Sequence, residues 1–247
     1  MKEWITGRNQ IYEVLKANRR QSFRLLVAQG VEEKGRLADI LRIATTLHLQ
    51  VERPPRPRLD SLGENPQGVA LEVGPYPYVD LSDIFDRAAQ RGEPLLILLL
   101  DLIQNPQNLG TLLRTAEAVD VHGVVLPLAR TASITPAVVS ASAGACEHLL
   151  VTQANLVQAI HRIKEANAWV TGLEASDEGL PPEKLRLDGS LALVVGSEGE
   201  GMRPLVRSVC DQLLALPMRG RVESLNAAVA GSIALYLVLQ ARRLNKA

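Results

Sequence analysis

The C-terminal two thirds of the chain alternate short apolar runs with segments whose apolar residues have helical spacing. The apolar runs are residues 95–101, 123–128, 148–152, 168–173, 191–196 and 212–217, and the helical segments are 110–119, 135–144, 155–166 and 226–243. Strands that are apolar throughout are typical of a parallel sheet buried on both faces, and helices between such strands form the two covering layers. The pattern therefore predicts an α/β domain built on a parallel sheet.

The first part of the chain predicts a second, smaller α/β domain. Helical spacing occurs at 9–17 and 33–47, and strand-like runs occur at 23–28 and 68–73. Between them lies the proline-rich and basic segment RPPRPR (53–58). We expect that segment to be an extended surface loop.

The domain boundaries follow from Pro75 and Pro77, because proline disfavours both a helix interior and a central strand. A length of 247 residues also fits two domains. We place the N-terminal domain at residues 1–76, a linker containing a short amphipathic helix (81–91) at 77–93, and the larger domain at 94–247.

The composition predicts a soluble protein of a reducing cytoplasm. Hydrophobic residues make up 47% of the chain and charged residues 22%, which suits a globular protein with a core. The first ten residues carry charges where a signal peptide would be apolar, and no apolar run approaches the roughly 20 residues of a membrane span. Cys146 and Cys210 offer neither a disulfide framework nor a metal-ligand spacing. We therefore expect no membrane contact and no bound metal.

Charge is distributed unevenly, although the net charge is zero. Residues 1–58 hold 12 Lys and Arg against 6 Asp and Glu, whereas residues 59–247 hold 15 against 21. Such asymmetry between segments suggests contact with nucleic acid. A solvated basic face would give the same count, so the charge pattern alone leaves both interpretations open.

The first polar loop after a predicted strand is DLIQNPQNLGTLLRTAE, residues 101–117. We expect Asn108 to lie in a turn and Gly110 to open a helix, whose first residues present free N–H groups. Arg114, six residues after Asn108, would then lie within reach of an anion bound at that helix start. A capped helix with a surface arginine is the competing interpretation.

The second loop is GSEGEG, residues 196–201, whose three glycines permit close approach of a ligand and positive φ angles. Its spacing, G-x-x-G-x-G, differs from the dinucleotide pattern G-x-G-x-x-G and follows a late strand, which disfavours a dehydrogenase-like enzyme. The Glu198 carboxylate would repel a phosphate and suits a neutral or cationic ligand. A plain tight turn is the alternative.

The third loop is LPMRGRVESLN, residues 216–226, which precedes a helix rich in Ala, Gly and Ser. Ser224 and Asn226 flank Leu225 at the helix start, where Ser and Asn are common N-caps. All three loops follow the carboxyl ends of strands, and open parallel sheets bind ligands at that edge. Their common location favours a single site over three unrelated turns.

Together the three loops resemble the three motifs of the SpoU family, also called the TrmH family. N-x-G-x-x-x-R-x-A-E matches residues 108–117, GSEGEG matches 196–201, and P-M-x-G-x-V-x-S-L-N matches 217–226. The resemblance extends to the start of the chain, because GRNQIYEVLKANRR (7–20) and NPQGVALEV (65–73) are similar to the family's small RNA-binding domain.

Enzymes of this family are S-adenosylmethionine-dependent RNA 2′-O-ribose methyltransferases of the SPOUT superfamily. The resemblance implies a deep trefoil knot in the C-terminal domain, an N-terminal domain similar to ribosomal protein L30e, and a homodimer with active sites at the subunit interface. By motif position, S-adenosylmethionine would be held by the backbone around Gly196, Gly201, Leu216, Met218 and Leu225. The catalytic cluster would comprise Asn108, Arg114, Glu198, Ser224 and Asn226, and Arg114 could serve the partner subunit's site.

The family mechanism makes Arg114 the group that activates the ribose hydroxyl. Arginine stays protonated in proteins and is a poor proton acceptor. We therefore expect Arg114 to bind a phosphate and stabilise the developing oxyanion, while Ser224 and Asn226 orient the hydroxyl. Recognition through the 2′-hydroxyl would also explain a preference for RNA over DNA.

The closest subgroup comprises the bacterial 23S rRNA guanosine 2′-O-methyltransferases that act at the peptidyl-transferase P loop, which residues 199–220 resemble. A tRNA 2′-O-methyltransferase of the same family is the alternative. A non-catalytic RNA-binding protein on the same fold is the competitor from another class. Such a protein would be expected to have lost Arg114, Glu198 or Asn226, and all three are present.

Overall fold

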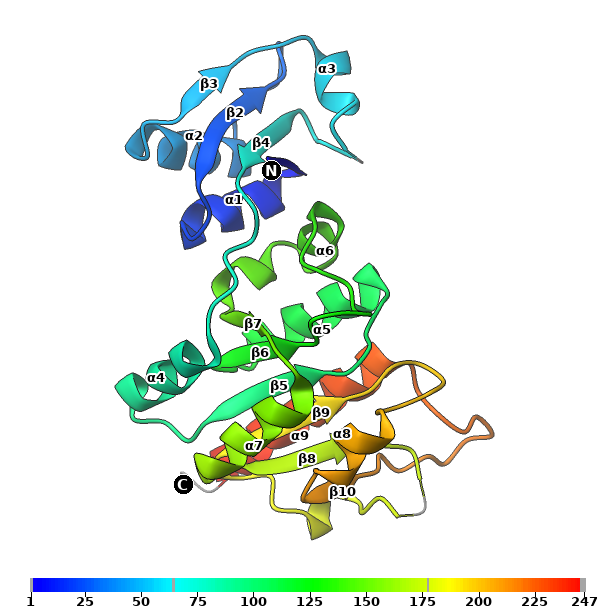
Figure 1. The fold of residues 1–247 in the computed structure, drawn as a ribbon. Helices are drawn as coiled ribbons and strands as arrows, with labels where there is room; N and C mark the ends of the chain where they lie inside the picture. The colour runs from blue at the N-terminus through cyan, green and yellow to red at the C-terminus, as the bar shows by residue number, and fades with distance from the viewer. Residues whose placement is uncertain (1, 64, 177, 245–247) are drawn as a thin grey trace. The chain divides into compact units, whose positions relative to one another are not determined.

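The computed structural model describes residues 2–63, 65–176 and 178–244. The chain forms two compact units, and the first of them is discontinuous (Figure 1). The N-terminal unit contains the residues up to Pro77 together with Ser133–His148, and the C-terminal unit contains Tyr78–Ala132 and the chain from Leu149 onward.

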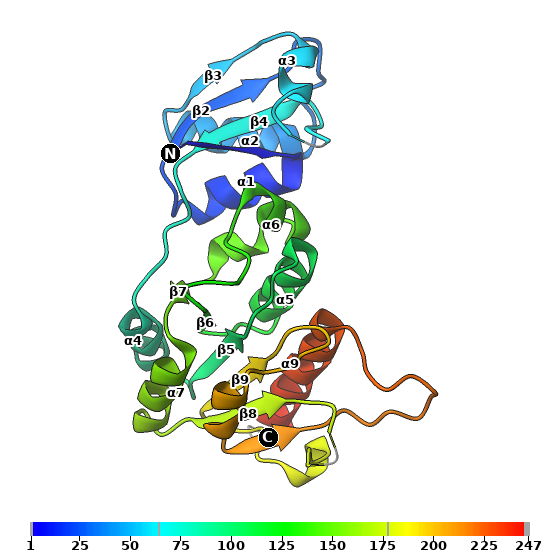
Figure 2. The same ribbon diagram turned by 45° about the vertical axis from the view of Figure 1, so that its right-hand side comes forward.

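The C-terminal unit is built on a six-stranded sheet in which every neighbouring pair is parallel (Figure 2). Its strands are β5 (Leu96–Leu100), β6 (Gly123–Leu126), β7 (Val151–Gln153), β8 (Trp169–Leu173), β9 (Leu191–Val195) and β10 (Gln212–Leu214), in the order β10-β8-β9-β5-β6-β7. The predicted parallel sheet is therefore confirmed. The strand order reverses between β5 and β9, and such switch points are where open parallel sheets bind ligands.

Helices cover both faces of this sheet. One face packs against α4 (Leu81–Arg91), α7 (Leu156–Glu165) and α8 (Pro204–Ser208), and the other against α5 (Pro106–Ala118) and α9 (Ala227–Leu244). The last two helices pack closely, because a Cβ on Gly231 of α9 would lie 2.6 Å from Leu112 of α5 and 3.1 Å from Val195 of β9.

Helix α4 belongs to this core, although the sequence placed it in a linker. Ile84 is fully buried, and a Cβ on Gly123 would lie 2.4 Å from its Cδ1 atom. The helix is defined by a capping box between Asp80 and Asp83 and ends at Gly92 in the left-handed region. Residues 81–91 are thus a structural layer of the C-terminal unit.

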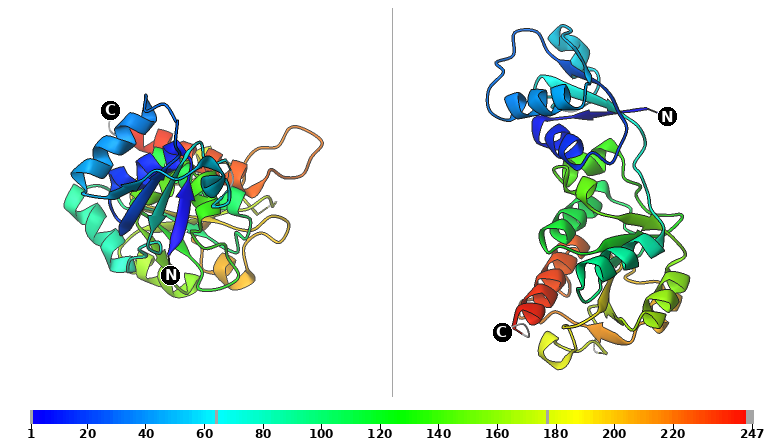
Figure 3. Two further views of the ribbon diagram at one scale, coloured as in Figure 1. Left: turned by 90° about the horizontal axis from the view of Figure 1, so that it is seen from above. Right: turned by 90° about the vertical axis from the view of Figure 1, so that its left-hand side faces the viewer.

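By length and composition alone, α9 could cross a membrane. No other helix among the described residues meets that criterion. Helix α9 is also the last covering helix of the sheet, as Figure 3 shows in red. Its small buried residues, among them Ala228, Gly231 and Ala234, face α5 and β9. Packing of this kind is what the core helix of an α/β domain requires, and it leaves the opposite face of α9 exposed.

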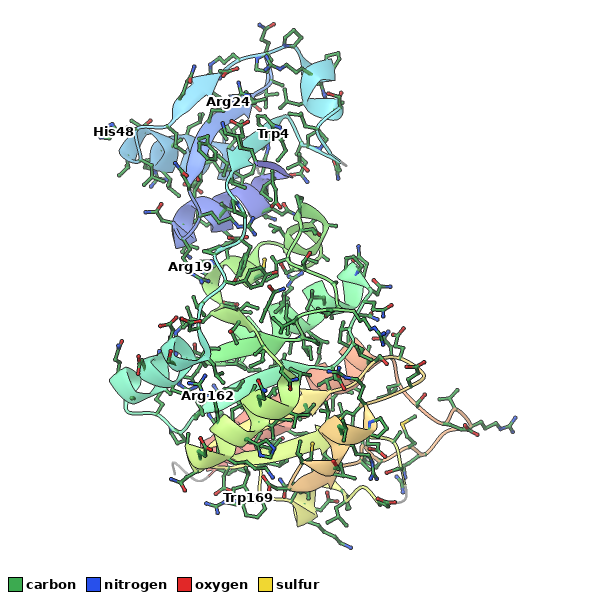
Figure 4. The ribbon with its side chains drawn as sticks, in the orientation of Figure 1. Trp4, Arg19, Arg24, His48, Arg162 and Trp169 are labelled. Atoms are coloured by element: carbon green, nitrogen blue, oxygen red, sulfur yellow. The ribbon has the colours of Figure 1, made fainter. Side chains whose placement is uncertain are left out.

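The N-terminal unit contains a four-stranded sheet with the order β1-β4-β2-β3. Its elements are β1 (Glu3–Thr6), α1 (Arg8–Ala17), β2 (Ser22–Val27), α2 (Arg36–Thr46), β3 (Gln50–Glu52), α3 (Arg56–Asp60) and β4 (Val69–Val73). The sequence pattern did not predict β1 and β3, because three or four residues carry too little periodicity. On this sheet the Arg24 guanidinium lies 5.4 Å from the centre of the Trp4 ring, and Figure 4 labels both side chains.

The prediction that residues 53–58 form an extended loop is wrong at its C-terminal end. Helix α3 begins at Arg56, with Pro57 in its first turn. Proline is tolerated there because the first N–H groups of a helix have no intrahelical acceptor. Burial of Leu59 fixes the helix against the sheet.

The segment 133–148 differs most from the predicted domain boundaries. It contains α6 (Pro136–Ala141) and the 3-10 turn Ala145–His148, and it packs into the N-terminal unit. Arg20 Nε donates to Glu147 Oε2 at 2.9 Å, and both side chains are at most 1% exposed. Tyr76 donates to the Cys146 carbonyl at 2.9 Å. Burial raises the pKa of the Glu147 carboxyl, and the Arg20 guanidinium opposes that shift.

We predict that Glu147→Ala destabilises the N-terminal unit by about 3–5 kcal/mol, because it leaves the buried Arg20 charge without its main partner. The chain has two tryptophans. A Trp169→Phe background therefore leaves Trp4 as the single fluorescent reporter of this unit during urea denaturation.

Glu3→Ala is the matched control, since Glu3 also contacts Arg20, at 3.2 Å, but is 24% exposed. We expect it to cost about 1 kcal/mol or less. Equal losses for the two variants would contradict the view that segment 133–148 is part of the core of this unit.

Candidate active site

The first two motif loops enclose a cavity of about 290 Å³ at the carboxyl edge of the parallel sheet, and the third reaches them through Asn226. The cavity is lined by Leu102, Ile103, Gln104, Asn105, Asn108, Ser197, Glu198 and Glu200. It therefore lies between the loops that follow β5 and β9, at the switch point of the sheet.

Helix α5 presents the first motif. It begins at Pro106, four residues earlier than predicted, and Asn105 caps it by accepting a hydrogen bond from Gln107 N at 2.8 Å. Asn108 is thus a helical residue of the first turn, and Gly110 lies inside the helix rather than opening it. This start directs the Asn108 side chain toward the loop after β9.

The glycine loop after β9 folds back on itself. Ser197 and Gly201 form a backbone bridge with N–O distances of 3.0 and 3.1 Å. A Cβ on Gly196 would lie 2.2 Å from the Gly201 carbonyl carbon, and Gly201 has φ +68°, so both positions require glycine. The closed loop places Glu198 and Glu200 at its tip, facing the cavity.

Asp101 fixes the far end of this loop. Its carboxylate is fully buried at the end of β5 and accepts hydrogen bonds from Arg203 N at 2.8 Å and Arg203 Nε at 2.7 Å. Asp101 N in turn donates to the Val195 carbonyl at 2.8 Å. The loop between Val195 and Arg203 is therefore held at both ends by one residue of the neighbouring strand.

Asn226 has two roles at the start of α9. Its Oδ1 atom accepts hydrogen bonds from Ala228 N at 2.9 Å and Val229 N at 3.1 Å, so it caps the helix. Because the cap requires the oxygen, the Nδ2 group must point the other way, toward Asn108 and Glu198. Asn226 is therefore both the cap of α9 and a neighbour of two other motif residues, and its catalytic role stays a prediction.

Asn108, Glu198 and Asn226 form a hydrogen-bonded cluster from three separate loops. Asn226 Nδ2 donates to Asn108 Oδ1 at 3.2 Å and to Glu198 Oε1, and Asn108 Nδ2 donates to the same Glu198 oxygen at 2.9 Å. Every donor in this cluster is oriented by the cap at α9. Two amide donors on one oxygen hold the carboxylate and leave Oε2 as the oxygen with most capacity to accept.

The other predicted catalytic residues are not in this cluster. Arg114 is an exposed residue of α5, and six residues of helix separate it from Asn108 by about 9 Å along the axis and about 240° around it. It therefore does not lie at the helix start, as the sequence had suggested. Ser224 is exposed in the loop before α9, two residues from Asn226.

The residues predicted to hold a cofactor occupy two places. Gly196 and Gly201 form the base of the glycine loop, next to the cavity. Leu216, Met218 and Leu225 lie on the segment between β10 and α9, which extends away from the sheet in Figure 1. Leu225 is 38% exposed.

Sequence reasoning missed the pairing of Asp101 with Arg203. The one available signal was an aspartate directly after the apolar strand 96–100, a position where a buried carboxylate needs a partner. Nothing in the local pattern identified Arg203 as that partner, because the two residues are brought together only by the pairing of β5 with β9.

Comparison with known proteins gives two matches to family models. The SpoU rRNA methylase family model matches residues 95–236, and the model for RNA 2′-O ribose methyltransferase substrate binding matches residues 4–79. A chain of Bacillus subtilis (strain 168) assigned to the TrmH family of tRNA/rRNA methyltransferases is 38% identical over 246 residues, which are 97% of this chain and 96% of the relative. A Staphylococcus aureus (strain COL) chain with the same assignment is 38% identical over 240 residues, 96% of each chain.

Solved structures share the fold. The SpoU methyltransferase AviRb from Streptomyces viridochromogenes, in complex with AdoMet, superposes with a TM-score of 0.80 at 24% identity, over 97% of this chain and 89% of that one. An AdoMet-bound rRNA methyltransferase from Sinorhizobium meliloti gives 0.78 at 20% identity, over 97% and 87%. At these identities the likeness is one of fold.

We predict that Asp101→Asn loosens the glycine loop. The substitution removes a charge-assisted hydrogen bond to Arg203, so the free energy of unfolding of the C-terminal unit should fall by about 1.5–3 kcal/mol. Hydrogen exchange of the Ser197 and Gly201 amides, followed by mass spectrometry, should become faster than in the unaltered chain.

Asp211→Asn is the matched control, because Asp211 also accepts from one backbone N–H (Val170, 2.8 Å) and one cation (Lys164, 2.6 Å). It should lower stability without changing exchange in residues 196–203. Unchanged exchange at Ser197 and Gly201 in Asp101→Asn would show that the carboxylate does not position the loop.

Proposed function

Because the chain belongs to the SpoU rRNA methylase family, we propose that it transfers the methyl group of S-adenosylmethionine to a ribose 2′-hydroxyl of RNA. The observation that carries this proposal is the cluster of Asn108, Glu198 and Asn226, in which three motif loops converge on one carboxylate. The preferred substrate is a guanosine of 23S rRNA, on the resemblance of residues 199–220, and tRNA is the alternative. We expect the enzyme to act in the cytoplasm.

The cavity suits a cationic ligand such as S-adenosylmethionine. Glu198 and Glu200 both line it, and Gly199 and Gly201 have positive φ with nothing within 4 Å of an added Cβ, so backbone there is open to a ligand. AviRb, which shares the fold, was solved with AdoMet. Gly196, Gly201, Leu216, Met218 and Leu225 would hold the cosubstrate. When bound, it supplies an electrophilic methyl group for an in-line displacement.

The residues of the cluster would then position the attacking hydroxyl. The Asn226 amide is fixed by the helix cap, so it can orient a ribose oxygen without reorganising, and Ser224 adds a second polar group on the same loop. Arg114 would bind a phosphate and stabilise the developing oxyanion, because a guanidinium is a strong donor and a poor base. Positioning of this kind supplies a large part of the barrier reduction in a displacement reaction.

A homodimer is part of the proposal. The outer face of α9 carries Val229, Ile233 and Tyr236, which are 45%, 41% and 54% exposed and share one helical stripe. Two of these residues, Ile233 and Tyr236, line a groove of about 460 Å³ together with Ser232. Exposed apolar patches mark contact sites, and one helix face can pair with its own copy about a two-fold axis.

Arg114 is outside the cluster of its own chain, and the next residue of α5 contacts a residue that lines this groove. Its neighbour Thr115 contacts Ser232 through hydroxyl oxygens 2.8 Å apart. A second copy docked on α9 would therefore be close to Arg114, which supports the assignment of Arg114 to the partner's site. A trefoil knot at the C-terminus and an L30e-like N-terminal domain remain predictions of the family resemblance.

The reaction is tested by incubating the full chain with tritiated S-adenosylmethionine and either 23S rRNA or tRNA. We expect label in 23S rRNA as a 2′-O-methylguanosine, mapped by nuclease digestion. Asn226→Ser tests the cluster: it keeps a capping oxygen but loses the amide donor, and should slow transfer by about 100-fold or more. Label in tRNA alone would show that tRNA, and not 23S rRNA, is the substrate. Label in neither RNA would refute the proposed activity.

Mixing two inactive variants tests the placement of Arg114. Arg114→Ala should abolish turnover and still bind S-adenosylmethionine, and Asn226→Ser should lower turnover by about 100-fold or more. If Arg114 serves the partner's site, random mixed dimers contain one intact site, and about a quarter of the unaltered activity should return. Subunit exchange is checked with two affinity tags. No recovery despite exchange would place Arg114 in the site of its own chain.

A further inference from the structure

We propose that Arg219 and Arg221 bind the phosphate backbone of the RNA substrate, next to the nucleotide in the active site. This inference rests on the proposed function and adds to it a binding surface outside the cluster. Both residues lie in the exposed segment between β10 and α9, on either side of Gly220. The third motif, P-M-x-G-x-V-x-S-L-N, leaves these two positions open, so the motif itself does not account for the two arginines.

The segment projects from the carboxyl edge of the sheet. Figure 1 and the left view of Figure 3 both show it in orange, extending outward before it returns to α9. It is anchored at its start, where Ala215 N donates to the Leu180 carbonyl at 2.9 Å, and at its end by Asn226. Arg221 is five positions before Asn226, which limits the distance between their Cα atoms to about 18 Å. The two guanidinium groups are therefore within a few nucleotides of the proposed site.

Most other cations of this unit are already used within it. Arg203 pairs with Asp101, Arg207 with Glu174 and Glu178, and Lys164 with Asp211, at 2.5–2.7 Å. Arg242 donates to the carbonyl oxygens of Leu95 and Gly189. Within residues 178–244 of the described chain, Arg219 and Arg221 take part in none of the ion pairs, so their donors are free for a ligand.

The site beside these two arginines is acidic. Glu198 and Glu200 line the cavity, and Glu223 lies close by in the sequence. A ribose that enters the cavity brings a phosphate on each side, and like charges repel over the Debye length of about 8–10 Å. Exposure of the two arginines could also mean only that the loop is solvated. That reading gives no source for the positive potential that an acidic site needs to accept a polyanion. Two guanidinium groups supply it, because their forked donors match phosphate oxygens.

The experiment measures the affinity of the full chain for an RNA transcript that it methylates, over a series of salt concentrations. Each phosphate contact adds about 0.7 to the log–log salt slope for single strands and about 0.9 for duplex. The double variant Arg219→Ala/Arg221→Ala should bind RNA more weakly, and its slope should fall by about 1.4–1.8. Affinity for S-adenosylmethionine, measured by calorimetry, should be unchanged. Arg219→Lys/Arg221→Lys should retain most of the slope.

Arg162→Ala is the matched control, because Arg162 is an exposed arginine on α7, away from the motif loops (Figure 4). It should change neither affinity nor slope. An unaltered RNA affinity and slope in the double variant would overturn the inference while leaving the methyltransferase assignment intact. Loss of S-adenosylmethionine binding would also overturn it, because the loop would then serve the cosubstrate. Absence of methyl transfer by the unaltered chain would instead refute the proposed function.

Discussion

The hydrogen bonds that Asn226 makes in two directions connect the fold of this protein to its site. The carboxamide oxygen must accept from the first turn of α9, since those N–H groups have no other acceptor within the helix. The amide nitrogen is thereby committed to Asn108 and Glu198. Packing of α9 on α5 through Gly231 sets where this cap lies. The orientation of the cluster thus follows from helix packing.

Much of the C-terminal unit was predictable because its strands are apolar throughout. Leu96–Leu100 and Leu191–Val195 could be recognised as buried parallel strands from the sequence pattern alone, and position after a strand was enough to place the polar loops at one edge. The glycines of 196–201 and the asparagines at 108 and 226 were therefore expected to meet. Their individual bonds were not predictable, because amide orientation depends on the helix cap.

The remaining features depend on contacts between distant residues. No periodicity connects Arg20 with Glu147 or Asp101 with Arg203, since each pair forms only when separate elements are packed together. The helical pattern at 135–144 was read correctly as helix, but a pattern of apolar spacing does not say which core the helix joins. Arg114 was placed near the helix start for a similar reason, because the start itself was set four residues too late.

The two proposed ligands of the C-terminal unit require opposite charges. A cationic cosubstrate favours carboxylates in the cavity, and Glu198 and Glu200 supply them. A polyanionic RNA favours the opposite charge, and screening in salt confines each effect to about 10 Å. One cavity therefore cannot satisfy both ligands with the same residues. Placing the carboxylates on a closed glycine loop and the arginines on a projecting loop separates the two potentials in space. With the proposed roles of the two loops, that separation would let a chain of zero net charge bind both ligands.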